Sequence, residues 1–234
     1  MSIAEDYVKI RNEIPENVVI VIAAKTRTMK EIEEVIDAGA TDIGENYVQE
    51  AEKIYKGLSP EKAKQVKWHM IGPLQKNKIN KALGTFDVIQ TIDSFEIARA
   101  IDKRVSTHGV VLHPAEAGRV WEIVPVYIEV NIAGEKTKSG IAQERVLELI
   151  ELMSGLENIK VEGLMTMEPY SENPEDARPY FKKMKELFEK AKEIKMPNVD
   201  IKILSMGMSN SYKVAIEEGS NMVRIGTAIF GPRN

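Results

Sequence analysis

The sequence contains no cysteine among its 234 residues, so it forms no disulfide and offers no thiolate for metal binding or nucleophilic catalysis. Its net charge of -4 shows no basic excess of the kind that nucleic-acid-binding proteins carry. No apolar run is long enough to cross a bilayer, and the amphipathic amino terminus has no apolar signal core. We therefore expect a soluble, cytoplasmic protein without nucleic-acid or membrane partners and without a metal site.

An apolar run at residues 18–24 ends on a lone lysine, Lys25. A short β-branched run of this kind is typical of a strand that is buried on both faces of a parallel sheet. Lys25 is then expected where the strand emerges, and partial burial there lowers the pKa of an amine and makes it a nucleophile toward a carbonyl. The alternative is a lysine that extends from the strand end into water.

The same pattern of a strand followed by a helix recurs along the chain. Eight strands are expected, at residues 18–24, 41–44, 66–71, 86–91, 123–132, 161–165, 199–204 and 222–225. Thr28 to Glu31 form a capping box that begins the first helix after a strand. Eight such units predict an α/β fold, a (β/α)₈ TIM barrel in a single domain over residues 1–234, with an extra helix at residues 1–11.

Three connections depart from the simple alternation of strand and helix. Residues 57–65 are expected to form a polar connector, and residues 105–122 an inserted excursion between a helix and the next strand. A helix is expected to begin near Asn173 and to restart or kink at Pro179.

Two glycine-containing loops follow the last two strands, where TIM barrels commonly bind phosphate. Gly226 lets the backbone approach an anion, Thr227 adds a hydroxyl, and Ser209 is expected at the amino terminus of a helix spanning residues 209–218. The alternatives are that Ser209 is a plain helix cap and Gly226 a simple turn.

Three further side chains belong to the same expected end of the barrel. Arg224 ends a strand that should be buried, so it either forms an ion pair with Glu45 or another carboxylate or binds a ligand. Asn46 follows the second strand and offers both a donor and an acceptor. His69 lies within the third strand and is either a ligand-facing ring or a satisfied core residue.

A lysine at one strand end and a phosphate cradle across the mouth are the parts that bind pyridoxal 5′-phosphate. The sequence also resembles a known family, the pyridoxal phosphate homeostasis proteins, which are single-domain relatives of the alanine racemase barrel. The resemblance extends over nearly the whole chain and is carried by residues 23–25, 44–50, 68–78, 129–132, 138–140, 163–165, 204–209 and 223–231.

The resemblance implies that Lys25 holds the cofactor as a Schiff base, that Met208, Ser209, Gly226 and Thr227 bind its phosphate, and that Arg224 faces its pyridine nitrogen. An arginine there keeps the ring nitrogen unprotonated and weakens the ring as an electron sink. The family implies a carrier or buffer of the cofactor, with transient contact to the apo-enzymes that receive it. Racemase relatives add a β domain that supplies a tyrosine base, whereas this sequence ends at Asn234.

The sequence departs from the family in a few places. Many relatives carry an aspartate where this chain has Ser211, and residues 105–122 are longer than the usual connection. Lys138 matches a lysine in the loop after the fifth strand and is either a surface charge or a second amine for cofactor transfer.

Two other functions remain open from the sequence. A pyridoxal-phosphate-dependent amino-acid racemase would need an acid–base group opposite Lys25, for which Tyr47 and Tyr212 are the available candidates. A Schiff-base aldolase for a sugar phosphate would bind no chromophore.

Overall fold

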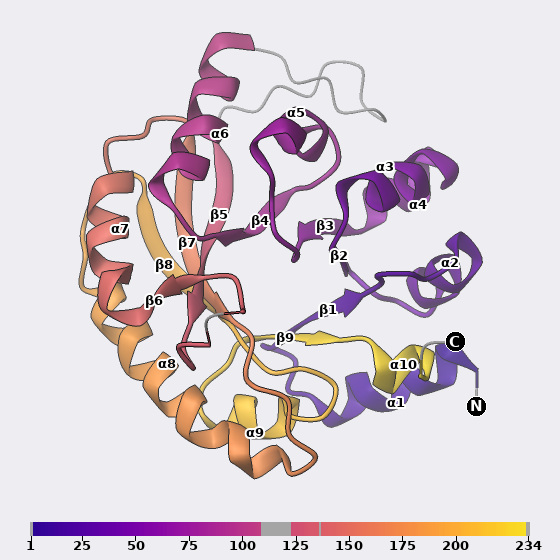
Figure 1. The fold of residues 1–234 in the computed structure, drawn as a ribbon. Coiled ribbons are helices and arrows are strands. Elements are labelled where there is room, and N and C mark those ends of the chain that lie inside the picture. The colour runs from indigo at the N-terminus through magenta and orange to yellow at the C-terminus, as the bar shows by residue number, and fades with distance from the viewer. Residues whose placement is uncertain (1, 109–122, 136, 233–234) are drawn as a thin grey trace.

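A closed barrel of eight parallel strands forms the centre of the molecule (Figure 1). The computed structural model describes residues 2–108, 123–135 and 137–232. The barrel strands are β1 (Val19–Ala23), β2 (Asp42–Glu45), β3 (Lys67–Met70), β4 (Val88–Ile92), β5 (Val124–Asn131), β7 (Ile159–Thr166), β8 (Val199–Ser205) and β9 (Met222–Ile225). Each pairs with its neighbours in parallel register, and the pairing of β4 with β5 completes the ring. The predicted (β/α)₈ barrel is confirmed.

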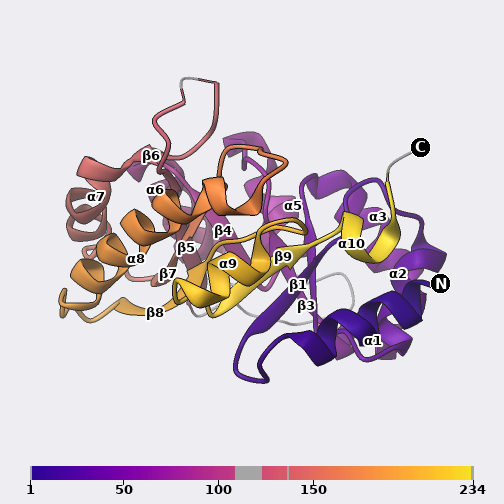
Figure 2. The same ribbon diagram turned by 90° about the horizontal axis from the view of Figure 1, so that it is seen from below.

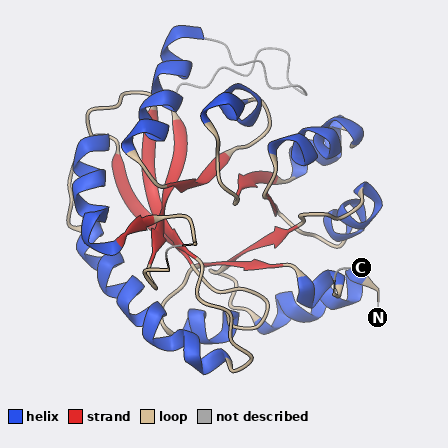
Figure 3. Ribbon diagram, viewed as in Figure 1, coloured by secondary structure: helices blue, strands red, loops and turns tan. Residues whose placement is uncertain are grey.

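Helices surround the barrel on its outside, as the blue ring in Figure 3 shows. They are α1 (Ile3–Glu13), α2 (Met29–Asp37), α3 (Val48–Gly57), α4 (Pro60–Gln65), α5 (Ile79–Leu83), α6 (Phe95–His108), α7 (Val146–Met153), α8 (Arg178–Lys192), α9 (Tyr212–Glu217) and α10 (Thr227–Phe230). Short 3₁₀ turns precede three of them, at Lys76–Lys78, Gln143–Arg145 and Pro174–Ala177. The extra amino-terminal helix α1 lies beside α2 and α10 (Figure 2).

The predicted capping box forms at the start of α2. The Thr28 hydroxyl accepts from the Glu31 backbone N–H, and the Glu31 carboxylate accepts from the Thr28 N–H at 2.7 Å. Since both bonds satisfy N–H groups that the first helical turn leaves without partners, they fix the point at which the chain leaves β1 and its loop and enters the helix. Pro179 occupies the first turn of α8, where its missing N–H costs nothing, so the predicted restart is confirmed.

Alternate residues of each strand face either the helices or the inside of the barrel. A separate apolar cluster fills part of the inside, formed by Val21, Ile71, Val88, Tyr127, Met165 and Met222. Buried polar side chains share this interior, among them His69, Gln90 and Arg224. The barrel is thus a packed core rather than a pore, and any ligand must bind at one of its ends.

Several connections differ from the sequence prediction. Residues 60–65 of the expected polar connector form α4, which the Ser59 hydroxyl caps. A two-residue strand, β6 (Ile141–Ala142), pairs with the end of β5 and was not expected. Residues 105–108 of the expected excursion continue α6, and residues 109–122 lie outside the described residues. Among the residues that are described, no helix has the length and apolarity needed to span a membrane.

Candidate functional site

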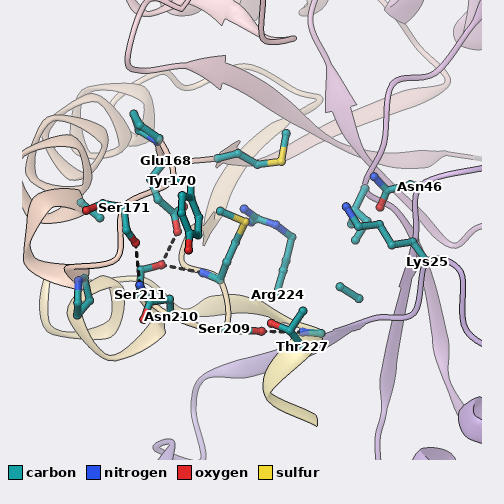
Figure 4. A pocket seen from close by; sticks show the side chains of 18 of the residues that line it. Lys25, Asn46, Glu168, Tyr170, Ser171, Ser209, Asn210, Ser211, Arg224 and Thr227 are labelled. Carbon is teal, nitrogen blue, oxygen red and sulfur yellow. Dashed lines mark hydrogen bonds between the residues drawn. The ribbon is translucent and has the colours of Figure 1, made fainter. Parts of the chain in front are cut away.

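A cavity of about 390 Å³ opens at the carboxyl ends of the strands (Figure 4). Seven of the eight side chains or backbone positions predicted for the site line it, namely Lys25, Asn46, Met208, Ser209, Arg224, Gly226 and Thr227. They come from loops that follow β1, β2 and β8 and from the end of β9, so the fold brings together positions that are far apart in the sequence. This is the end of a barrel at which ligands and substrates bind.

A tight turn after β1 carries Lys25. The backbone ladder continues through Ala24, whose N–H donates to the Gly44 carbonyl at 2.9 Å, and then Thr26 turns the chain with a left-handed φ of 64°. Non-glycine residues rarely adopt this conformation, and it costs free energy that the surrounding contacts must offset. The Thr26 N–H donates to a Glu50 oxygen of α3 at 3.4 Å.

The other side of this turn is attached to the carboxyl-terminal segment by Arg27. Its guanidinium donates to the Gly231 carbonyl at 2.7 Å and lies over the Phe230 ring, with 5.1 Å between Cζ and the ring centroid. The Lys25 turn is thereby held between α3 and α10, and α10 begins with Thr227, which lines the same pocket after the neighbouring strand β9.

Asn46 occupies the wall beside Lys25, and Figure 4 shows the two side chains on the same side of the pocket. The backbone at Gly72 lies directly against Asn46, because a Cβ at position 72 would come within 2.4 Å of the Asn46 carbonyl oxygen. A glycine is therefore needed after β3 to let the chain pass the wall.

Hydrogen bonds join the two loops that were predicted to bind phosphate. The Ser209 hydroxyl accepts from the Gly226 N–H at 3.1 Å and from the Ala228 N–H at 3.3 Å. The prediction of a helix starting at Ser209 is wrong, because α9 begins only at Tyr212 and the Ser209 side chain instead binds the loop after β9. Backbone N–H groups of that loop therefore converge on one oxygen at the edge of the pocket, next to the Thr227 hydroxyl.

Arg224 lies at the centre of the pocket floor and is almost completely buried. Its Nη1 donates to the Ser205 hydroxyl at 2.7 Å and its Nη2 to the Thr166 carbonyl at 2.6 Å. Burial lowers the pKa of Arg224, and the charges of Glu168 and Glu129 oppose that shift.

The ion pair between Arg224 and Glu45 that the sequence allowed does not form. Glu45 faces away from the barrel interior, and neither of its carboxyl oxygens has a hydrogen-bond partner among the described residues. Burial, with the nearby charge of Glu50, raises the pKa of Glu45 to about 8.

The charges around the pocket favour an anionic ligand. Three cationic residues line the cavity, Lys25, Arg27 and Arg224, against one carboxylate, Glu168. A cavity of this size suits a small organic molecule, and the Ser209 and Thr227 hydroxyls that line it suit a phosphate. The primary amine of Lys25 in the same cavity completes a site for a phosphorylated carbonyl compound.

Comparison with known proteins agrees with this geometry. Residues 2–234 match the family described as alanine racemase, N-terminal domain. The chain is 43% identical over 211 residues to the pyridoxal phosphate homeostasis protein of Aquifex aeolicus, covering 90% of this chain and 85% of that protein. It is 33% identical to the protein of the same name from Escherichia coli K12, covering 100% and 97% of the two chains. The chain belongs to the family of pyridoxal phosphate homeostasis proteins.

Solved structures give the same result for the fold. PipY of Synechococcus elongatus with pyridoxal phosphate bound is 26% identical and superposes with a TM-score of 0.84, covering 98% of this chain and 100% of that one. An alanine racemase from Clostridium difficile, at 15% identity, shares the fold with a TM-score of 0.76 and is covered over 59% of its length.

His69 is the one predicted site residue that does not line the pocket. Its ring is 1% exposed inside the barrel, with Nε2 2.8 Å from Asp42 Oδ1 and Nδ1 2.9 Å from Gln90 Nε2. The structure therefore agrees with the alternative of a satisfied core histidine.

One whole wall of the pocket was not predicted from the sequence. The loop between β7 and α8 contributes Glu168, Tyr170 and Ser171, and the loop after β8 adds Asn210. Tyr170 is 86% exposed at the rim. The available signal was a polar segment directly after a barrel strand, which the general rule for barrel sites already marks as a candidate.

Glu168 connects this wall to two residues considered from the sequence, Ser211 and Lys138. The Ser211 hydroxyl donates to the Glu168 carboxylate and accepts from the Met208 N–H. Lys138 Nζ donates to the Glu168 backbone carbonyl at 3.1 Å and also lies 3.2 Å from Glu135. A carboxylate is thus present beside Ser211, on the neighbouring loop at Glu168.

Proposed function

We propose that this protein binds pyridoxal 5′-phosphate at the Lys25 pocket and acts as an intracellular carrier or buffer of that cofactor in the cytoplasm. The observation that carries the proposal is that one cavity is lined by the Lys25 amine, by the Ser209 and Thr227 hydroxyls and by the buried Arg224 guanidinium (Figure 4). The name of the Aquifex aeolicus relative and the cofactor bound to PipY support the same ligand.

The pocket residues fit the cofactor group by group. When bound, its aldehyde supplies an electrophilic carbon that can bond covalently to the Lys25 amine. Ser209 and Thr227 would hold the phosphate through their hydroxyls, beside the Gly226 and Met208 backbone, whose N–H groups donate to the Ser209 and Ser211 hydroxyls.

Two further residues would fix the ring of the cofactor. Arg224 would face the ring nitrogen as a permanent donor and keep that nitrogen free of a proton. Asn46 would contact the ring edge from the Lys25 side.

The same pocket argues against robust catalysis. Tyr47, one candidate base, is 55% exposed and does not line the cavity. Tyr212, the other, donates its hydroxyl to Glu13 at 2.8 Å. Tyr170 does line the pocket, but its side chain is 86% exposed at the rim and is not enclosed with the Lys25 amine.

Release to another protein requires access to the bound cofactor. The pocket opens to the surface at its rim, where Tyr170 is exposed and Lys138 is bound to the Glu168 carbonyl. We propose that apo-enzymes dependent on pyridoxal phosphate make transient contact with this rim.

The test is the visible spectrum of the purified protein after incubation with pyridoxal phosphate, before and after borohydride reduction. We expect an absorption band that borohydride bleaches, and its loss in Lys25→Ala because no other amine should replace that nucleophile. Lys30→Ala, an exposed lysine of α2 outside the pocket lining, is the matched control and should keep the band.

Two results would count against the proposal. A protein that stays colourless with the cofactor excludes it and favours the sugar-phosphate aldolase, in which borohydride traps substrate on Lys25. Racemisation of a common amino acid at about 1 s⁻¹ or faster would make the protein a racemase instead of a carrier.

A further inference from the structure

A continuous chain of buried side-chain hydrogen bonds runs through the inside of the barrel from the pocket floor to its opposite end. It consists of Arg224 Nη1 to Ser205 Oγ at 2.7 Å, Ser205 Oγ to Gln90 Oε1 at 2.8 Å, Gln90 Nε2 to His69 Nδ1 at 2.9 Å, and His69 Nε2 to Asp42 Oδ1 at 2.8 Å. The five residues come from five different strands, β9, β8, β4, β3 and β2.

Every hydrogen bond of this series is donated in the same direction, from Arg224 toward Asp42. Arg224 has no acceptor, so Ser205 Oγ must accept from it and use its own hydrogen toward Gln90 Oε1. The Gln90 amide then turns its NH₂ toward His69, whose Nδ1 must be the unprotonated nitrogen. The ring proton is therefore on Nε2 and is donated to Asp42.

Burial makes this order hard to disturb. Gln90 and Ser205 are fully buried and His69 is 1% exposed, so a broken bond leaves polar atoms without water as a substitute. The two ends of the chain carry opposite charges, a guanidinium at the pocket and a carboxylate at the far end, which favours the same direction of every bond between them.

We propose that Ser205, Gln90 and His69 are positioning residues for Arg224, which hold its guanidinium in one orientation toward the pocket through a one-way hydrogen-bond chain anchored on Asp42. None of the three lines the pocket, so they act on a ligand only through Arg224. An arginine side chain without such support has several rotatable bonds to order, and fixing them beforehand lowers the cost of binding. For its effect on the cofactor, the inference rests on the proposed function.

The decisive variant is Gln90→Leu, which removes the two central bonds while roughly keeping the size of the side chain. Thr91→Val is the matched control, because Thr91 is the next residue of β4, is 3% exposed, and loses one buried bond, to the Gly72 carbonyl at 2.8 Å. Both variants are expected to be less stable, and a purely structural role would affect them alike.

The first readout uses the protein without cofactor. The side-chain N–H signals of Arg224 in a ¹⁵N-labelled sample, identified by their absence from Arg224→Lys, should shift and exchange with water about fivefold faster or more in Gln90→Leu. They should stay as in the wild type in Thr91→Val. If Gln90→Leu does not fold, Ser205→Ala replaces it, with the same expected shift.

The second readout is the dissociation constant and band position of bound pyridoxal phosphate. Gln90→Leu should bind about fivefold more weakly and with a displaced absorption maximum, since the ring nitrogen then faces a mobile guanidinium. Unchanged Arg224 signals together with unchanged affinity in Gln90→Leu overturn the inference. If the wild type binds no pyridoxal phosphate, the proposed function fails, and the Arg224 signals of the two variants still decide the inference.

Discussion

Asp42 and Glu45 lie three residues apart on β2, on opposite faces of the same strand, and their carboxyl groups have opposite environments. Asp42 faces the barrel interior, where burial favours its neutral form, yet the hydrogen bonds from His69 and Thr41 more than compensate and hold its pKa below the usual range. Glu45 faces the helices without a hydrogen-bond partner among the described residues, and its pKa rises to about 8.

The difference shows that position in a buried strand does not decide whether a carboxyl group is ionised. Both residues are nearly inaccessible to water, at 8% and 0% exposure, so desolvation penalises both charges. What separates them is the number of donors that the fold provides. The donors on the interior face therefore keep Asp42 ionised, at one end of the hydrogen-bond chain that leads to Arg224. Within the described part of the chain, the outer face provides no such donors, so Glu45 is favoured there as a neutral acid.

The largest expected loss of stability comes from removing the Asp42 carboxylate, which is hydrogen-bonded to His69 and Thr41. Asp42→Ala removes the charged acceptor of two hydrogen bonds, one from the His69 Nε2–H and one from the Thr41 hydroxyl. Since a hydrogen bond to a charged group is typically worth about 1.5–3 kcal/mol, we expect a loss on the order of 3–5 kcal/mol. Urea unfolding at pH 7 measures this loss of free energy. Asp37→Ala, an exposed acid of α2, is the control and should change little. A loss in Asp42→Ala no larger than in the control would mean that the interior carboxylate is not held by its partners.

The contribution of Glu45 to stability should change with pH in the direction opposite to that of Asp42. Since the pKa of Glu45 is raised in the folded state, its contribution to stability is fully present below about pH 4.5 and is lost as the pH rises toward about 8. Glu45→Gln removes this loss, so we expect it to be more stable than the wild type by on the order of 3 kcal/mol at pH 9. The two proteins should be equally stable at pH 4.

Urea unfolding at several pH values gives the measurement for Glu45→Gln. A constant difference across that range would show that Glu45 is ionised in the folded protein, and would remove the contrast with Asp42.

The fold was predictable from sequence because its signals are local and repeated. The first barrel strand, β1, is a short apolar run, the helix after it begins at the Thr28 capping box, and a strand followed by a helix recurs along the chain. The position of Lys25 could be predicted in the same way, because the buried strand ends where the apolar residues 18–24 end, and Lys25 is the next residue. Helix α4 was missed because only six residues, four of them charged or polar, separate Pro60 from the next strand region.

The partners inside the site were less predictable, because they depend on which side chains meet across the barrel. Arg224 was correctly identified as a buried cation, but Ser205 and the Thr166 carbonyl satisfy it instead of Glu45. Alternation along β2 decides this outcome: Asp42 and Gly44 face inward, so Glu45 faces outward. If the register of β2 were shifted by one residue, Glu45 would face the interior and Asp42 would face the helices. The register depends on the packing of all the barrel strands, so it cannot be deduced from the sequence of β2 alone.

The smallest expected effect isolates one donor to Asp42. Thr41→Val removes the hydroxyl that donates to Asp42 Oδ2 at 2.7 Å and leaves His69 in place. With one donor fewer, the pKa of Asp42 should move back toward its ordinary value, so we expect a loss of about 1 kcal/mol at pH 7. Because a carboxyl group with a lowered pKa stabilises the fold above its unfolded pKa and loses this effect as the pH falls, the difference from wild type should narrow in acid. Urea unfolding at pH 7 and pH 3 compares the two proteins. Equal stability at both pH values would mean that His69 alone keeps Asp42 ionised, and that a single well-placed donor is enough to separate the two carboxyl groups of β2.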